Sequence, residues 1–226
     1  MKLGVLFSGG KDSTLALHMA AEKEEIACLI TVRSINPESY MFHTPNIDIT
    51  KLQGEALGLP SIEKATKGKK EKELIDLEKA IIQAKSQFGV EGIVTGAVES
   101  VYQSERIQRI CHRLGVWCIN PLWKKNQQEL LNELLEKHFK VVISGIFAYP
   151  LDESWLGKEI DPEIIRRLTN LQQEFGISPS GEGGEIETTV LDAPLFTKRI
   201  EVVDSRTQAC GNSGIFEILQ ARLIPK

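Results

Sequence analysis

Short apolar runs and helix-like segments alternate over the first two thirds of this chain, and this alternation constrains the fold more than any other feature. Strands are predicted over residues 2–7, 26–32, 61–66, 92–95, 116–119 and 140–146. Helices are predicted over residues 14–23, 47–57, 70–88, 104–114 and 127–138. Because strands that are separated by helices pair in parallel, the pattern predicts an α/β fold: a mostly parallel sheet with helices on both faces.

The pattern changes after Phe147. A predicted helix near residues 162–175 is followed by turn-rich and strand-like segments that read EIETTVLDAPLF, RIEVVDS and GIFEILQARLI. This change predicts a smaller α+β C-terminal domain. We therefore expect one domain over residues 1–147 and a second, substrate-binding domain over residues 148–226.

The stretch SGGKDS, at residues 8–13, lies between the first predicted strand and the first predicted helix. Free backbone N–H groups and the positive end of the helix dipole bind oxyanions at such a position. Gly9 and Gly10 let a ligand approach the main chain, Lys11 adds a positive charge, and Ser8 and Ser13 add hydroxyls. The stretch therefore indicates a phosphate-binding loop rather than a plain strand-to-helix turn with a solvated lysine.

Two common nucleotide-binding patterns do not fit this loop. The Walker A pattern needs glycine at position 5 and Ser or Thr at position 12, where this chain has Val5 and Asp12. The pattern Gly-x-Gly-x-x-Gly fails because Gly9 and Gly10 are adjacent. The stretch instead resembles the pyrophosphate loop of the ATP pyrophosphatases. That resemblance implies cleavage of ATP between its α and β phosphates and activation of a substrate oxygen as an adenylate.

Further candidate residues follow other predicted strands. Ser8, Arg33 and Gly96 all fall at carboxyl ends of strands, where ligands of parallel sheets bind, which predicts one nucleotide site built from several loops. His43, in an apparent loop, is either a nucleotide contact or an isolated surface histidine. The residues that open the helix after Gly96 are expected to face the ligand, with a solvated helix surface as the alternative: Tyr102, Gln103 and Arg106.

A second unusual stretch, GEGGEIETT at residues 181–189, carries three carboxylates among three glycines. It is either a solvated acidic turn or a binding site. Glu185 and Glu187 are two residues apart and share a face if a strand has begun there. Neighbouring like charges destabilise the fold unless a cation compensates them, so Mg²⁺, a substrate ammonium group or captured ammonia is expected nearby.

Four segments together resemble the diphthine–ammonia ligase family. They are GEGGEIETTVLDAPLF at residues 181–196, FHTPN at 42–46, TGAVESVYQSERIQRICHRLG at 95–115 and PLW at 121–123. With the N-terminal loop, the resemblance spans nearly the full chain. Two positions depart from the family pattern, since Ile186 replaces an aromatic residue and Thr189 an aliphatic one.

The resemblance implies a specific reaction: amidation of the diphthine carboxylate on translation elongation factor 2 with ATP, Mg²⁺ and ammonium. The products would be diphthamide, AMP and pyrophosphate, formed through an acyl-adenylate. The expected catalytic residues are Lys11, Asp12, Glu185 and Glu187, with Asp12 also as the metal ligand. The expected nucleotide-binding residues are Ser8, Gly9, Gly10, Lys11, Asp12, Ser13, Arg33, His43 and Gly96. The expected substrate-binding residues are Tyr102, Gln103, Arg106, Glu182, Gly183, Gly184, Glu185, Glu187 and Thr188.

Composition limits the partners. The net charge is −4, with residues 1–145 contributing 19 basic against 18 acidic residues (+1) and residues 146–226 contributing 8 against 13 (−5). A basic surface for nucleic acid is therefore not expected. The sequence contains no apolar run of the roughly 20 residues that a membrane-spanning helix needs. We expect a cytoplasmic protein with an elongation factor as its protein substrate, and a homodimer is a further expectation.

Two alternative functions stay open. A related thiolase acting on transfer RNA would be expected to carry paired cysteines and a basic face. However, Cys28, Cys111, Cys118 and Cys210 show no Cys-x-x-Cys spacing and are read as buried thiols. A nucleotide-binding protein without catalysis would be expected to have a degraded loop. An aromatic cage for the trimethylammonium group of diphthine, built from Trp123 or Trp155, is a weaker hypothesis.

Overall fold

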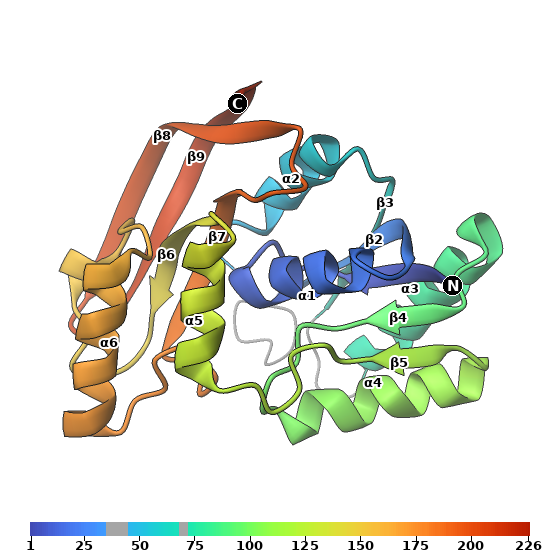
Figure 1. The fold of residues 1–226 in the computed structure, drawn as a ribbon, viewed down its shortest axis with the longest axis horizontal. Coiled ribbons are helices and arrows are strands. Elements are labelled where there is room, and N and C mark those ends of the chain that lie inside the picture. Colours follow the sequence, from blue (N-terminus) through green and yellow to red (C-terminus); the bar gives the residue numbers. More distant parts are fainter. Residues whose placement is uncertain (35–44, 68–71) are drawn as a thin grey trace.

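The computed structural model describes residues 1–34, 45–67 and 72–226, and it confirms the α/β fold (Figure 1). Five parallel strands form the first sheet in the order β3-β2-β1-β4-β5. Their bounds are β1 (Lys2–Leu6), β2 (Glu25–Ser34), β3 (Ser61–Thr66), β4 (Gly92–Val94) and β5 (Trp117–Ile119). The central strand β1 leads directly into the predicted phosphate loop, so the loop starts from the middle of the sheet.

Helices cover both faces of this sheet, and each face has its own apolar core. The helices α1 (Lys11–Ala21) and α2 (Thr50–Leu57) pack into one core. A short 3-10 turn (Ile47–Ile49) leads into α2. The helices α3 (Glu73–Phe88) and α4 (Val101–Leu114) pack into the other. Because helices cover both faces of the sheet, its central strands are almost fully buried. In β1, residues 3–5 are buried.

Capping explains where two helices begin. The helix predicted from residue 104 begins at Val101, because the Ser100 side chain accepts a hydrogen bond from the backbone N–H of Gln103. The helix predicted from residue 14 begins at Lys11, with Gly10 as the residue before it. The earlier start places Lys11 and Asp12 in the first turn of α1, at the positive end of the helix dipole.

A second, antiparallel sheet forms the C-terminal part, as expected for an α+β unit. Its order is β7-β6-β9-β8, and its strands are β6 (Lys140–Ile146), β7 (Ile186–Asp192), β8 (Lys198–Cys210) and β9 (Ser213–Pro225). The helices α5 (Gln127–Glu136) and α6 (Pro162–Phe175) lie beside this sheet (Figure 1), and a 3-10 turn (Glu153–Trp155) precedes α6.

Strand β6 corrects one sequence-based interpretation. The alternation counted it with the parallel sheet, but it pairs antiparallel with β7 and β9. A fully buried apolar run reads the same in either kind of sheet, so hydrophobicity alone does not identify its partners. The expected domain boundary at residue 147 stays a prediction, with β6 now grouped with the C-terminal sheet.

The two sheets share one continuous core and are joined by hydrogen bonds. Strand β7 is at the edge of its sheet, and the Val190 N–H donates to the Gly9 carbonyl oxygen at 3.0 Å. Farther along, the Leu195 N–H donates to Nε2 of His18, whose pKa burial lowers to about 4, so that this imidazole is neutral. The phosphate loop therefore lies directly against the second sheet. Within the described residues, no helix combines the length and apolar character that crossing a membrane requires.

Candidate functional site

The loop after β1 has the conformation of an anion-binding turn. Gly9 has a φ of +78°, which a residue with a Cβ rarely adopts, and Gly10 precedes the first turn of α1. The hydroxyl oxygens of Ser8 and Ser13 lie 3.2 Å apart, and Ser13 Oγ donates to the Gly10 carbonyl oxygen at 3.1 Å. The loop is thus held by its own serines around the start of the helix.

A cavity of about 210 Å³ lies at this loop, between the two sheets. Its wall has three parts, contributed by the loop, by the segment after β4 and by the stretch that enters β7. The lining residues are Ser8, Gly10, Lys11, Asp12, Gly96, Ala97, Ser100, Gln103, Gly181, Glu182, Gly183, Gly184, Ile186, Glu187 and Thr188. The structure therefore brings together two sequence stretches that lie about 170 residues apart in the chain, and both contain residues that the sequence analysis expects in the site.

Close packing explains the glycine at position 96. A Cβ on Gly96 would lie 2.7 Å from the backbone nitrogen of Ser13 and 2.8 Å from the carbonyl carbon of Asp12. Real Cβ atoms do not approach backbone so closely, so any larger residue would displace the first turn of α1. Gly96 thus contributes by letting the two segments approach each other.

Lys11 is the buried cation of the cleft. Its side chain is 4% exposed, and its Nζ lies 2.8 Å from Oδ2 of Asp12. Burial acts to lower the pKa of Lys11, but Asp12, Glu182 and Glu187 outweigh it, so the pKa is raised. The Lys11 N–H donates to Oγ1 of the buried Thr188 at 3.1 Å. Lys11 is therefore charged and is fixed at both its main chain and its side chain.

Two carboxylates of the C-terminal stretch face this lysine. Burial and the Asp12 carboxylate raise the pKa of Glu182 to about 7, although Lys11 opposes the shift. Burial also raises the pKa of Glu187 to about 7, with Lys11 lowering it and Asp12 raising it. Near neutral pH these two groups are therefore partly protonated, and each can exchange a proton with a ligand.

Asp12 supplies an acceptor that the protein leaves without a partner. Its Oδ1 atom is buried and, within the described residues, accepts no hydrogen bond. A buried carboxylate oxygen in this state suits a cation or a donor group of a ligand. No group of three or more His, Cys, Asp or Glu residues that could hold a metal ion occurs in the described ranges. A divalent ion at Asp12 would therefore need ligand oxygens as well.

The structure separates Glu185 from Glu187, which the sequence interpretation placed on one face. Strand β7 begins only at Ile186, so Glu185 still belongs to the preceding loop. Its two carboxylate oxygens accept hydrogen bonds from the Ser178 N–H at 3.0 Å and the Gly183 N–H at 2.9 Å. Glu185 thus shapes the loop, whereas Glu187 lines the cleft.

Other predicted residues lie outside the cleft lining. Arg33 forms an ion pair with Asp48 at 2.9 Å on the surface and is about half exposed. The Arg106 guanidinium stacks on the Tyr102 ring, 3.5 Å from its centre, and of the three predicted α4 residues only Gln103 lines the cavity. His43 lies outside the described residues.

The proposed tryptophan cage and the cysteine interpretation are partly corrected. Trp155 is 4% exposed and lies beneath the Arg167 guanidinium, so its face is already occupied by a cation. Trp123 is 38% exposed. Among the cysteines, Cys28 and Cys111 are buried as expected, whereas Cys210 on β8 is exposed.

Sequence reasoning missed the residues that support the acidic stretch. Oε1 of Gln127, the first residue of α5, accepts hydrogen bonds from the hydroxyls of Ser178 and Ser180 at 2.5 and 2.9 Å. The Ser178 hydroxyl oxygen in turn accepts from the Glu182 N–H at 2.8 Å. These contacts join segments about 50 residues apart, and no local pattern in the sequence signals them.

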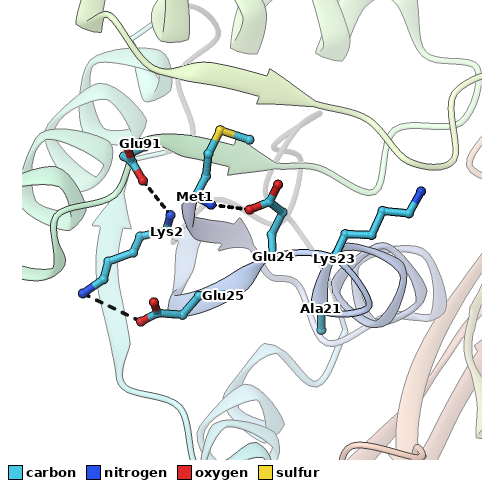
Figure 2. Close-up of a pocket in the computed structure, with 7 residues that line it drawn as sticks. All are labelled: Met1, Lys2, Ala21, Lys23, Glu24, Glu25 and Glu91. Carbon is cyan, nitrogen blue, oxygen red and sulfur yellow. Dashed lines mark hydrogen bonds and ion pairs between the residues drawn. The ribbon is translucent and has the colours of Figure 1, made fainter.

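A second hollow lies at the opposite, amino end of the parallel strands, and Figure 2 shows its lining. Its carboxylates all have partners: Glu24 pairs with the Met1 amino group, Glu25 with the Lys2 ammonium at 3.7 Å, and Glu91 accepts from the Lys2 backbone N–H at 2.8 Å (Figure 2). Ligands of parallel sheets bind at the carboxyl ends of the strands, so the cleft at the phosphate loop is the candidate site.

A glycine-rich loop with a buried lysine, at the carboxyl end of the central parallel strand, defines a phosphate-binding α/β protein. The comparisons with known proteins agree. The family model described as the diphthamide synthase N-terminal domain matches residues 1–118, and that of the C-terminal domain matches residues 126–224. The chain therefore belongs to the diphthamide synthase family, and it is a ligase of diphthamide biosynthesis.

Named relatives support this assignment. The diphthine–ammonia ligase of Mus musculus is 34% identical over 225 residues, covering 91% of this chain and 84% of the relative. The diphthine–ammonia ligase of Homo sapiens is 33% identical, again covering 91% of this chain and 84% of the relative. Among solved structures, the predicted subunit of tRNA methyltransferase from Methanocaldococcus jannaschii covers 86% of this chain and 98% of its own, at 18% identity. Its TM-score of 0.45 is too low to support a conclusion.

Proposed function

We propose that this chain amidates the carboxylate of diphthine on translation elongation factor 2, using ATP and ammonia. The products are diphthamide, AMP and pyrophosphate, and the intermediate is an acyl-adenylate. One observation carries the proposal: in a chain of this family, a phosphate loop and two carboxylates with pKa values near 7 line the same 210 Å³ cleft. A cleft with both kinds of group suits a reaction that needs both an activated phosphate and a proton acceptor.

The loop side of the cleft would bind the nucleotide. The backbone N–H groups in the first turn of α1 and the Lys11 ammonium would supply positive charge where negative charge develops on the departing pyrophosphate. Gly10 and Gly96 leave room for phosphates beside the main chain. In the first step, a carboxylate oxygen of diphthine bonds to the α-phosphorus while the bond to pyrophosphate breaks.

The residues of the cleft also fit Mg²⁺. The unpartnered, buried Oδ1 of Asp12 is a hard oxygen donor of the kind this ion prefers, and Mg²⁺ is commonly held by one or two carboxylates together with substrate phosphates. Asp12 would hold the ion, with Glu182 and Glu187 close enough to act electrostatically on the same region. When bound, Mg²⁺ supplies charge neutralisation for the phosphates.

The acidic side of the cleft would serve the second step. Ammonia attacks the acyl carbon, the bond to AMP breaks, and the nitrogen must lose a proton. Glu187 is the best-placed acceptor because it lines the cleft and its pKa of about 7 allows it to take up a proton at neutral pH. Glu182, with a similar pKa, would help to hold an ammonium ion before it loses its proton.

The macromolecular substrate and location follow from the same proposal. An elongation factor is a cytoplasmic protein, so a cytoplasmic location is expected for an enzyme that modifies it. The acidic cleft suits the positive trimethylammonium group that diphthine carries beside its carboxylate. Dimerisation stays a prediction.

Product analysis tests the proposal. The chain would be incubated with ATP, Mg²⁺, ammonium and diphthine-bearing elongation factor 2, and AMP would be separated from ADP. We expect AMP and pyrophosphate to accumulate over many turnovers only when both ammonium and the modified factor are present. Lys11→Ala should lower the rate by about 10²–10³-fold. Lys23→Ala, in the exposed turn after α1, should leave it unchanged. AMP that forms without the factor would assign the chain another substrate, and ADP would contradict the proposed bond cleavage.

A further inference from the structure

Gln53 is a polar residue whose complete burial needs an explanation. It lies on the short helix α2, and its side chain is completely inaccessible to water. Burying an amide costs free energy unless its hydrogen bonds to water are replaced. Gln53 does not line the cleft, so direct contact with a ligand in the cavity does not account for it.

The amide nitrogen of Gln53 joins two chain segments. Nε2 donates to the carbonyl oxygen of Gly9 in the phosphate loop at 2.9 Å, and to the carbonyl oxygen of Val190 in β7 at 2.7 Å. The Val190 N–H also donates to the Gly9 carbonyl at 3.0 Å. One side chain on α2 therefore connects the phosphate loop to the edge of the second sheet.

The amide of Gln53 also packs against Gly9, the phosphate-loop residue with a left-handed backbone conformation. Gly9 has a left-handed φ of +78°, and a Cβ placed there would lie 2.3 Å from Oε1 of Gln53. Within the described residues, that Oε1 atom has no hydrogen-bond partner, so the contact with Gly9 is a packing contact. Gly9 immediately precedes Gly10 and the first N–H groups of α1, and its conformation sets their direction.

We propose that Gln53 is a positioning residue, which holds the phosphate loop in its phosphate-binding conformation and keeps Glu187 of β7 opposite Lys11. The proposal deepens the proposed function and rests on it in naming ATP as the ligand of the loop. A residue with this role controls ATP affinity, whereas a residue that only fills the interior controls stability alone.

Gln53→Met is the main test, because methionine preserves the length and approximate volume of the side chain but lacks the donor. Gln53→Glu is a stronger second variant, since an oxygen would then face two carbonyl oxygens. Two controls match these changes. Gln83→Met makes the same replacement on α3, remote from the loop. Ile81→Val truncates a fully buried residue in the core on the other face of the parallel sheet.

Three measurements would be made on the full chain: thermal unfolding, calorimetric titration with ATP and Mg²⁺, and hydrogen exchange of backbone amides. We expect Gln53→Met to weaken ATP binding at least tenfold and to speed exchange at the Val190 amide. Ile81→Val should lower the melting temperature while ATP affinity stays within twofold of wild type. A Gln53→Met chain that melts early but binds ATP within twofold of wild type would overturn the proposal.

The wild-type chain provides a test that no folding defect can affect. ATP binding should slow hydrogen exchange at Val190 together with Gly10 and Lys11, and an unchanged rate at Val190 would contradict the proposed link. If wild type does not bind ATP, the proposed function fails. The exchange rate of Val190 in Gln53→Met then still decides the link, since an unchanged rate refutes it.

Discussion

Two parts of the cleft wall, the phosphate-loop wall and the acidic wall of residues 181–188, are built in different ways. The phosphate-loop wall comes from six consecutive residues, whose serine hydroxyls make local hydrogen bonds, and distant residues such as Gln53 and Gly96 pack against it. The acidic wall depends on contacts between distant segments, such as those of Gln127 with Ser178 and Ser180. The chemical groups of the first wall therefore lie in one short stretch of sequence, whereas those of the second are arranged by tertiary contacts, and similar-looking carboxylates within it have different roles.

The sharpest test of this comparison replaces Glu185 and Glu187 of the acidic wall by glutamine, one at a time. Glu187→Gln should lower turnover about 10²-fold, because it removes the proton acceptor that lines the cleft. Glu185→Gln should lower turnover only a few-fold and should reduce stability by about 1–2 kcal/mol, because it weakens the bonds to two backbone N–H groups. Steady-state kinetics and thermal unfolding of both variants check this.

Equal losses of turnover with equal stabilities would show that the structure separates the two glutamates incorrectly. Burst kinetics would locate the defect further. Glu187→Gln should still release pyrophosphate in a first turnover, but not AMP, if its role is confined to the attack by ammonia.

The next largest effect concerns the segment after β4, which packs against the phosphate-loop wall. Gly96→Ala should weaken ATP binding by at least about tenfold, although it removes no chemical group, because its Cβ would collide with the backbone of Ser13 and Asp12. Gly89→Ala is a suitable control. It imposes strain at a φ of +68°, costing about 1 kcal/mol, but meets no atom within 4 Å and caps α3, which packs into the core on the other face of the parallel sheet. Calorimetric titration with ATP distinguishes the two variants, and normal affinity in Gly96→Ala would contradict the tight approach of the two segments.

A smaller effect concerns stability and pH. The folded state raises the pKa of Glu187 from 4.5 to about 7, so between these values it binds a proton that the unfolded chain has released. This group therefore makes the wild-type fold less stable as pH rises through that range. Glu187→Gln should abolish the loss, so its stability relative to wild type should increase by about 1–3 kcal/mol between about pH 5 and pH 8. Urea unfolding at several pH values measures this, and parallel curves would refute it.

The smallest expected effect is at Arg33, which the sequence analysis assigned to nucleotide binding. Its guanidinium is ion-paired with Asp48 and the side chain is about half exposed to water, and exposed pairs contribute about 0–1 kcal/mol. Arg33→Ala should therefore change ATP affinity less than about twofold, as measured by titration. A loss above tenfold would return Arg33 to the binding site.

Much of the fold could be predicted because its pattern is local. The strands at residues 61–66 and 140–146 and the helix at residues 162–175 have the predicted bounds, since apolar periodicity and capping residues define them. The sheet to which β6 belongs could not be predicted. Its apolar residues would be buried in the parallel sheet or in the antiparallel sheet. Only its pairing with β7 and β9 shows that it belongs to the antiparallel sheet.

The site divides in the same way. The stretch SGGKDS and the acidic stretch were both identified from sequence, and both line the cleft. The difference between Glu185 and Glu187 was not, because it depends on β7 starting at Ile186 rather than one residue earlier. Gln53 is one glutamine in a short helix, and only the approach of the Gly9 and Val190 carbonyls gives it a role.

Covering the edge of β7 has a further consequence, for solubility. An uncovered edge strand offers unpaired N–H and C=O groups to the strands of other molecules and promotes aggregation. Here the phosphate loop and Gln53 bond to Val190 along that edge. A C-terminal fragment expressed without the loop would present this edge bare, and we expect it to self-associate. The loop that is proposed to bind ATP therefore also protects the second sheet from aggregation.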